Sequence, residues 1–201
     1  MEVPDPLRKS LGLVFCDIVG STRLVARVGD LVAAAVIREF IDHADRLSRQ
    51  HHSLMIKFSG DTFLAAFENM NDVMPFIVSI EGLLTPNSAL ERLEGFRFSL
   101  HYGNVLYMDT SYGNDVLGED VTVAAHLSEV AHPNELVISQ AALERMPADY
   151  QFRAGASEVR PLKRVGDVEF RRVKLLEENR TLFKLIQSFS RPYRLRQNGR
   201  E

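Results

Sequence analysis

The sequence predicts an α+β fold built on a ferredoxin-like βαββαβ core with additional strands. Residues 11–17 (LGLVFCD) form a short apolar run that ends in a charge, which is typical of a buried strand. Apolar residues then recur at helical spacing over 23–50, and two strand-like runs at 53–58 and 62–67 enclose a turn that contains Gly60. This order favours an antiparallel sheet with helices on one face.

The helical segment at 23–50 is expected to break near Gly29, because glycine weakens a helix interior. Further elements follow at spacings that complete the core and extend it. In chain order they are a helix at 72–84, a strand at 95–106, a helix at 120–130, a strand at 136–139, a short helix at 140–145, and strands at 150–157 and 168–174.

The length of 201 residues fits one well-buried domain and is short for two. We expect an N-terminal lead at 1–10, a domain at 11–176 and a helical, basic extension at 177–201. Three interpretations of the extension stay open. It docks onto a dimer or a partner, it meets anionic lipid, or it is a partly solvated tail.

Composition excludes several classes of function. The net charge of −3 argues against a nucleic-acid binder, which is usually strongly basic. The single cysteine excludes a disulfide within the chain, so a cytoplasmic location is expected. Membrane contact is not expected, because no apolar stretch approaches the roughly 18 residues of a membrane span.

Two acids fall where the predicted sheet would bring them together. Asp17 ends the first strand and Asp61 lies in the hairpin turn. If the first strand lies beside the hairpin, both carboxylates converge at one end of the sheet, near the backbone carbonyl of Ile18. Such hard oxygen ligands suit two Mg²⁺ or Mn²⁺ ions whose coordination is completed by substrate phosphates. The alternative is that both acids are ordinary turn residues.

Four segments in series resemble motifs of class III adenylate and guanylate cyclases. The likeness runs from about residue 11 to residue 174, in order and with suitable spacing. The segments are FCDIVGST at 15–22, KFSGDTFLAAF at 57–67, SLHYGNV at 99–105, and GEDVTVAAHL at 118–127 followed by AHPNELVIS at 131–139.

The resemblance implies a head-to-tail homodimer with composite active sites. One protomer would supply Asp17 and Asp61 for the metal ions, and the other would supply the groups that bind the base and stabilise the transition state. In this family the ribose 3′-hydroxyl attacks the α-phosphate of a nucleoside triphosphate, which gives a 3′,5′-cyclic nucleotide and pyrophosphate. The protein mainly positions the substrate and stabilises charge.

The resemblance also indicates the base. Lys57 matches the lysine that donates to a ring nitrogen of adenine, and Asp115 matches the acid that accepts from the exocyclic amine. This donor and acceptor pair favours ATP over GTP, since guanine presents the opposite pattern at that edge. The alternatives are a solvated lysine at a strand end and an aspartate in a loop.

The sequence departs from the family in its transition-state pair. Thr122 and His126 stand where the family has an asparagine and an arginine, and their four-residue spacing puts them on one helix face. A histidine is mostly neutral near pH 7 and does not replace a permanent, bidentate arginine charge. Lys163 resembles, in a loosely matching segment, the lysine that the family brings to the triphosphate. A basic surface turn is the alternative.

Three functional hypotheses therefore compete. The first is a slow or unusually tuned adenylate cyclase, which the intact acid pair favours. The second is a degenerate cyclase-like domain that binds nucleotide or regulates a partner without turnover, which Thr122 and His126 favour. The third is a cyclase for a different nucleotide.

Overall fold

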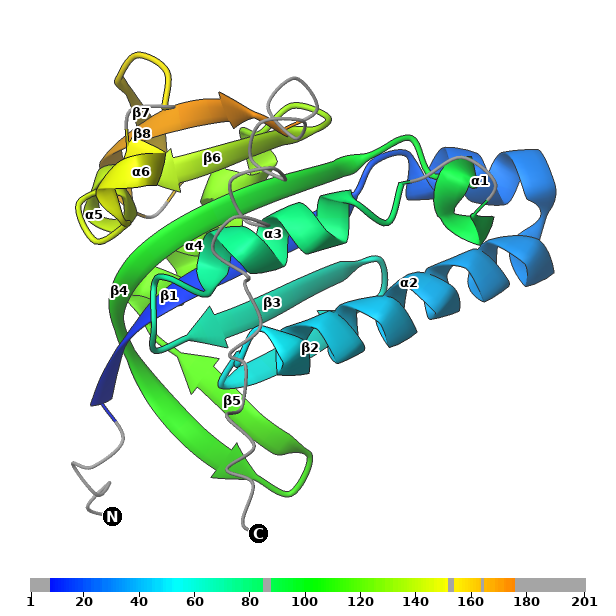
Figure 1. Cartoon of the computed structure of the whole chain (residues 1–201), viewed down its shortest axis with the longest axis horizontal. Coiled ribbons are helices and arrows are strands. Elements are labelled where there is room, and N and C mark those ends of the chain that lie inside the picture. Colours follow the sequence, from blue (N-terminus) through cyan, green and yellow to red (C-terminus); the bar gives the residue numbers. More distant parts are fainter. Residues whose placement is uncertain (1–7, 85–87, 152–153, 164, 176–201) are drawn as a thin grey trace, which may run out of the picture.

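The computed structural model describes residues 8–84, 88–151, 154–163 and 165–175, and an eight-stranded sheet forms its framework (Figure 1). The strands are β1 (Arg8–Ile18), β2 (Met55–Ser59), β3 (Thr62–Phe67), β4 (Phe96–Thr110), β5 (Gly113–Leu117), β6 (Glu135–Ser139), β7 (Glu158–Leu162) and β8 (Gly166–Lys174). The helices are α1 (Ser21–Val28), α2 (Asp30–Gln50), α3 (Val73–Glu81), α4 (Glu119–Glu129), α5 (Gln140–Leu143) and α6 (Ala148–Gln151), with a 3₁₀ turn, η2, at Ala89–Arg92.

The strand order confirms the predicted core. Strands run β2-β3-β1-β4-β6-β8-β7 across the sheet, and β5 pairs with the far end of β4. The first four strands with α2 and α3 therefore make the βαββαβ unit, in which β1 lies between β3 and β4 and is antiparallel to both. Because β4 and β6 are parallel, the complete sheet is mixed.

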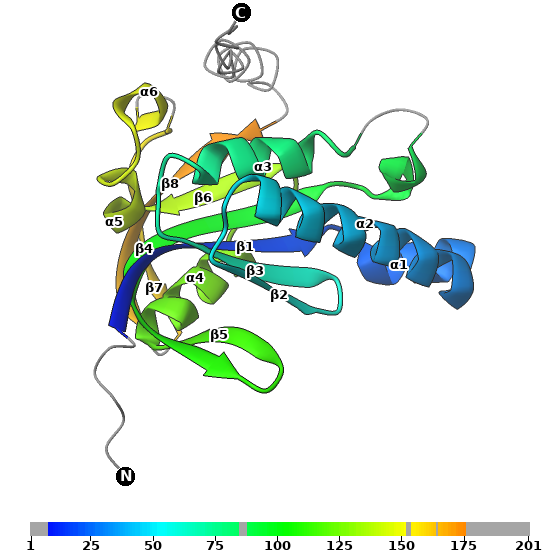
Figure 2. The ribbon, with the colours of Figure 1, turned by 60° about the horizontal axis from the view of Figure 1, so that its bottom comes forward.

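Helices cover both faces of this sheet. In Figure 2, α2 and α3 lie above it and α4 lies below it. Side chains of β1 alternate accordingly, so that Val14 and Cys16 join the core under α2 and α3, whereas Leu11 and Leu13 pack with Ala124 of α4. The expectation of helices on one face therefore holds for the core helices and is wrong for α4.

The helix break was correctly predicted, because Gly29 separates α1 from α2 at a φ of 79°. Two other expectations need correction. The predicted strand at 150–157 is wrong, since α6 begins right after Pro147 and β7 starts only at Glu158. Strand β5 was not predicted, because its polar Gly-Asn-Asp start is typical of a turn.

The predicted extension at 177–201 lies outside the described residues. Within the part of the chain that the structure does describe, no helix has both the length and the apolar character that crossing a membrane requires.

Glu81, in the last turn of α3, is a buried acid. Its side chain is 2% exposed, and neither carboxylate oxygen has a hydrogen-bond partner among the described residues. Burial raises the pKa of this carboxyl to about 7, because the charged form loses its hydration. The fold therefore favours the protonated form.

We expect Glu81→Gln to abolish a pH dependence of stability. In the unfolded chain the carboxyl ionises near its ordinary pKa of 4.5, whereas in the folded chain it ionises near 7. The wild type should therefore lose up to about 3 kcal/mol between pH 4.5 and 8, and the variant should not. Urea unfolding at pH 5 and pH 8 measures this. The exposed Glu119→Gln is the control, and equal pH profiles for wild type and Glu81→Gln would contradict the expectation.

Candidate active site

The structure brings Asp17 and Asp61 to the same end of the sheet. Asp17 lies opposite Thr62 in the β1–β3 ladder, and the Thr62 hydroxyl is 3.4 Å from Asp17 Oδ1. The backbone N–H of Ile18 donates to the carbonyl oxygen of Asp61 at 3.2 Å. The pairing of β1 with the β2–β3 hairpin thus produces the expected juxtaposition.

Arg97 belongs to the same cluster, and sequence analysis missed it. It lies opposite Asp17 on β4, and its Nε donates to Asp17 Oδ2 at 2.9 Å, with a second contact from Nη2. The Asp17 side chain is only 17% exposed, so this ion pair is partly shielded from water. The alternation of side chains along the strand could have predicted this position, since Arg97 points away from the face that carries Phe96 and Phe98.

The donor set at this end fits a hard divalent cation. Two carboxylates and the nearby Ile18 carbonyl are the oxygen ligands that Mg²⁺ and Mn²⁺ prefer. No group of three or more His, Cys, Asp or Glu side chains suited to a metal occurs among the described residues. Asp17, Asp61 and the Ile18 carbonyl would supply part of a coordination shell, which substrate phosphates would complete. A cation bound to Asp17 would compete with Arg97 for the carboxylate oxygens.

The start of α1 adds an anion-binding feature beside the two acids. Gly20 precedes the helix with a φ of 72°, and no side chain caps the first backbone N–H groups. Ser21 and Thr22, with Asp61, border a cavity of about 650 Å³. Free N–H groups and the helix dipole favour phosphate oxygens at such a terminus.

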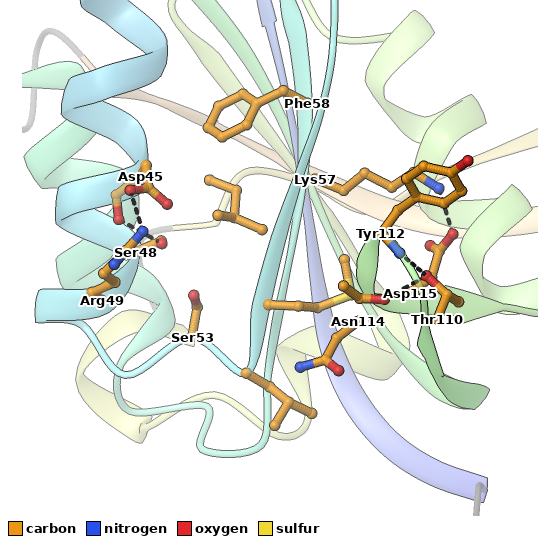
Figure 3. Close-up of a pocket in the computed structure, with 14 residues that line it drawn as sticks. Asp45, Ser48, Arg49, Ser53, Lys57, Phe58, Thr110, Tyr112, Asn114 and Asp115 are labelled. Carbon is orange, nitrogen blue, oxygen red and sulfur yellow. Dashed lines mark hydrogen bonds and ion pairs between the residues drawn. The ribbon is translucent and has the colours of Figure 1, made fainter.

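Lys57 and Asp115 form a second charged pair, in a separate cavity. The Lys57 Nζ on β2 lies 2.5 Å from Asp115 Oδ2 on β5, and this ammonium lowers the pKa of the Asp115 carboxyl. Both line a cavity of about 890 Å³ (Figure 3), which neither Asp17 nor Asp61 lines. Asp61 therefore borders one cavity, and Lys57 and Asp115 line another.

Thr122 and His126 lie one turn apart on α4. Thr122 is exposed. His126 is less accessible, with its side chain 21% exposed and its Nδ1 3.1 Å from Glu129 Oε1. The imidazole is thus engaged along its own helix.

Lys163 is exposed in the turn between β7 and β8. The preceding Leu162 packs in one cluster with Val123 and Leu127 of α4. The structure therefore brings the Lys163 turn near the helix that carries Thr122.

Comparison with known proteins assigns this architecture to a family. The model of the adenylate and guanylate cyclase catalytic domain matches residues 4–171. This chain belongs to that family. An adenylate cyclase of Glutamicibacter nicotianae is 22% identical over 166 residues, which are 83% of this chain and 39% of that protein. The chain thus spans about two fifths of that relative's length.

Solved cyclase structures share the fold of this cyclase domain. The catalytic core of a rhodopsin-guanylyl cyclase with converted specificity, in complex with ATPαS, has a TM-score of 0.72 at 18% identity, covering 84% of this chain and 98% of that one. The guanylate cyclase domain of Catenaria anguillulae in complex with GTP has a TM-score of 0.68 at 16% identity. The match covers 82% of this chain and 96% of that one. An adenylate cyclase of Trypanosoma brucei in its monomeric state has a TM-score of 0.68 at 16% identity. The match covers 87% of this chain and 93% of that one.

A hydrogen-bond network holds α4 of this cyclase domain against the sheet. Asp120 Oδ2 accepts the backbone N–H of Asn104 at 2.6 Å, and its Oδ1 lies 3.0 Å from His101 Nε2. His101 Nδ1 lies 2.8 Å from Ser139 Oγ, which also accepts the N–H of Ala142 at 3.1 Å. The network ties the start of α4 to β4 and α5, and so fixes where the helix carries its exposed residues.

Asp120, His101 and Ser139 are hydrogen-bonded in the same order as the acid, base and nucleophile of a serine hydrolase. The surroundings of Ser139 exclude a role as nucleophile. Ser139 is 2% exposed and caps α5, so no substrate reaches its hydroxyl. Gly103 makes room for the network, because a Cβ there would lie 2.2 Å from the Asp120 carboxyl carbon. The three side chains are therefore structural.

We expect His101→Ala to destabilise the domain by about 1–3 kcal/mol, because it removes one of the two hydrogen-bond partners of the buried Ser139 hydroxyl and one partner of the Asp120 carboxylate. The midpoint of urea unfolding measures the loss. His132→Ala is the matched control, since His132 is exposed. A midpoint for His101→Ala equal to that of the control would rule out the stabilising role.

Proposed function

We propose that this cyclase domain converts ATP to 3′,5′-cyclic AMP and pyrophosphate at a site shared by two copies of the chain. The observation that carries the proposal is the separation of two charged half-sites. Asp17 with Asp61 lies at one sheet end, and Lys57 with Asp115 lines another cavity. In a head-to-tail pair, the Asp17 and Asp61 end of one copy would face the Lys57 and Asp115 cavity of the other copy.

Adenine selection is inferred from the polarity of the second half-site. Lys57 is a donor and the Asp115 carboxylate an acceptor, in contact at 2.5 Å. The adenine edge offers a ring-nitrogen acceptor and an exocyclic amine donor, so both protein groups are satisfied. Guanine reverses that order and would leave buried polar groups unpaired, which disfavours GTP.

Different residues of the chain would bind the metal ions and the phosphates. Asp17, Asp61 and the Ile18 carbonyl would hold two Mg²⁺ or Mn²⁺ ions, which supply positive charge for the attacking and leaving oxygens. With Asp17 engaged by a metal ion, the Arg97 guanidinium would be available to bind two phosphate oxygens. The first N–H groups of α1 hold the far end of the triphosphate.

The surface around these residues supports self-association. Phe15, Tyr107 and Val121 are apolar side chains, only partly buried, on the sheet face that carries α4. Leu117, at the end of β5, is 59% exposed. A second copy that covers this face buries apolar surface and brings its α4, with Thr122 and His126, over the phosphates.

A second function is favoured by the state of His126. Its Nδ1 lies 3.1 Å from Glu129 Oε1, and histidine lacks the permanent forked charge of arginine. With a threonine in place of the family's asparagine, the domain would bind nucleotide or regulate a partner without turnover. Lys163, beside α4, is the group we infer to supply replacement charge if turnover occurs.

The proposal predicts cyclic AMP from ATP with Mn²⁺ or Mg²⁺, and little product from GTP. Asp17→Ala should lower the rate at least about 100-fold, because a metal ligand is lost. Product formation is followed by mass spectrometry with all four nucleoside triphosphates. Tight ATP binding without any product would instead support the regulatory alternative.

Restoring the family pair tests the role of α4. Thr122→Asn with His126→Arg should raise the rate about 10- to 1,000-fold, because each adds a preorganised donor to the transition state. Asp17→Ala in the same background is the control and should remain inactive. A double variant that folds, binds ATP and is no faster than wild type would contradict the placement of α4 over the phosphates.

A further inference from the structure

Tyr112 is a fully exposed aromatic residue at the tip of the β4–β5 hairpin. Its relative exposure is 100%, the highest among the large hydrophobic side chains of the described residues. An aromatic ring left entirely in water forgoes the stabilisation that burial would give it. Tyr and Trp are enriched at interfaces, because each combines an apolar ring with a polar group.

The hairpin holds this tyrosine on a defined turn. Thr110 pairs with Gly113, so Ser111 and Tyr112 form a two-residue loop. The Thr110 hydroxyl donates to the Gly113 carbonyl at 2.6 Å and accepts the Tyr112 N–H at 3.2 Å. Gly113 has a φ of 106°, which only glycine adopts readily. The Tyr112 backbone is therefore fixed, and its ring projects from a firm support.

The ring borders the cavity that contains Lys57 and Asp115. Figure 3 shows Tyr112 on the same side of this cavity as those two residues, with Asp45 and Arg49 on the opposite wall. The volume of about 890 Å³ leaves room for a purine. Polar groups that recognise the edge of a base and an aromatic face thus converge on one space.

We propose that Tyr112 stacks on the face of the nucleobase whose edge contacts Lys57 and Asp115. The inference rests on the base site of the proposed function and adds the residue that holds the plane of the base. Edge contacts alone leave a base free to tilt, whereas a ring against its face fixes the plane. Stacking accepts any base, so Tyr112 adds affinity while Lys57 and Asp115 select adenine.

Equilibrium binding separates this role from others. Calorimetric titrations with Mn²⁺ compare ATP with inorganic tripolyphosphate, which has phosphates but no base. We expect Tyr112→Ala to weaken ATP binding about 5- to 150-fold and to leave tripolyphosphate binding unchanged, since stacking contributes about 1–3 kcal/mol per base. Tyr112→Phe should stay within about twofold of wild type. Val159→Ala removes another exposed apolar side chain, on β7, and should change neither affinity.

The outcomes distinguish the stacking role from the proposed function. Equal ATP affinities for wild type and Tyr112→Ala overturn the stacking role. Sedimentation at the titration concentrations is the second readout. If Tyr112→Ala dissociates the dimer and weakens both ligands, Tyr112 is a partner contact and the inference is wrong. ATP binding that depends on Tyr112 without cyclic product supports the inference and refutes turnover. Wild-type protein that binds tripolyphosphate as tightly as ATP overturns the base site and the stacking role together.

Discussion

The pairing of β1 with both β3 and β4 is the constraint on which the candidate site depends. One register puts Thr62 and Arg97 on either side of Asp17, and the backbone bond from Ile18 brings Asp61 next to them. A slip of one residue would turn Asp17 toward α2 and α3 and expose Cys16 instead. Because Val14, Cys16 and Ile18 are buried, the hydrophobic core itself enforces the register that exposes the acid.

One acid of each candidate half-site is paired with a cationic side chain. Arg97 pairs with Asp17, and Lys57 pairs with Asp115, so the free domain leaves neither acid without a partner. A ligand then exchanges one set of partners for another, instead of meeting isolated charges. This arrangement costs some affinity, since existing pairs must open, but it keeps a partly buried carboxylate stable in the absence of substrate.

Much of the fold could be predicted from local patterns. The apolar run before Asp17, the helical spacing over 23–50 and the glycine turn of the hairpin each depend on neighbouring residues, and the structure agrees with all three. Strand β5 and the Arg97 contact could not be predicted in this way. The first is a polar strand defined by its partner β4, and the second joins residues 80 positions apart. The Lys57 and Asp115 pair was identified through a family resemblance, and spacing alone would not have found it.

Strand β4 has a mechanical consequence. Its 15 residues form one continuous strand roughly 50 Å long, with Arg97 near its start and the Tyr112 turn just beyond its end. A single strand therefore sets the distance between the Asp17 and Arg97 cluster and the hairpin that carries Asp115. In the proposed head-to-tail pair, the two β4 strands would run in opposite directions, so a bend of the sheet would change the fit at both shared sites together. The stiffness of one strand would then limit how independently the two centres operate.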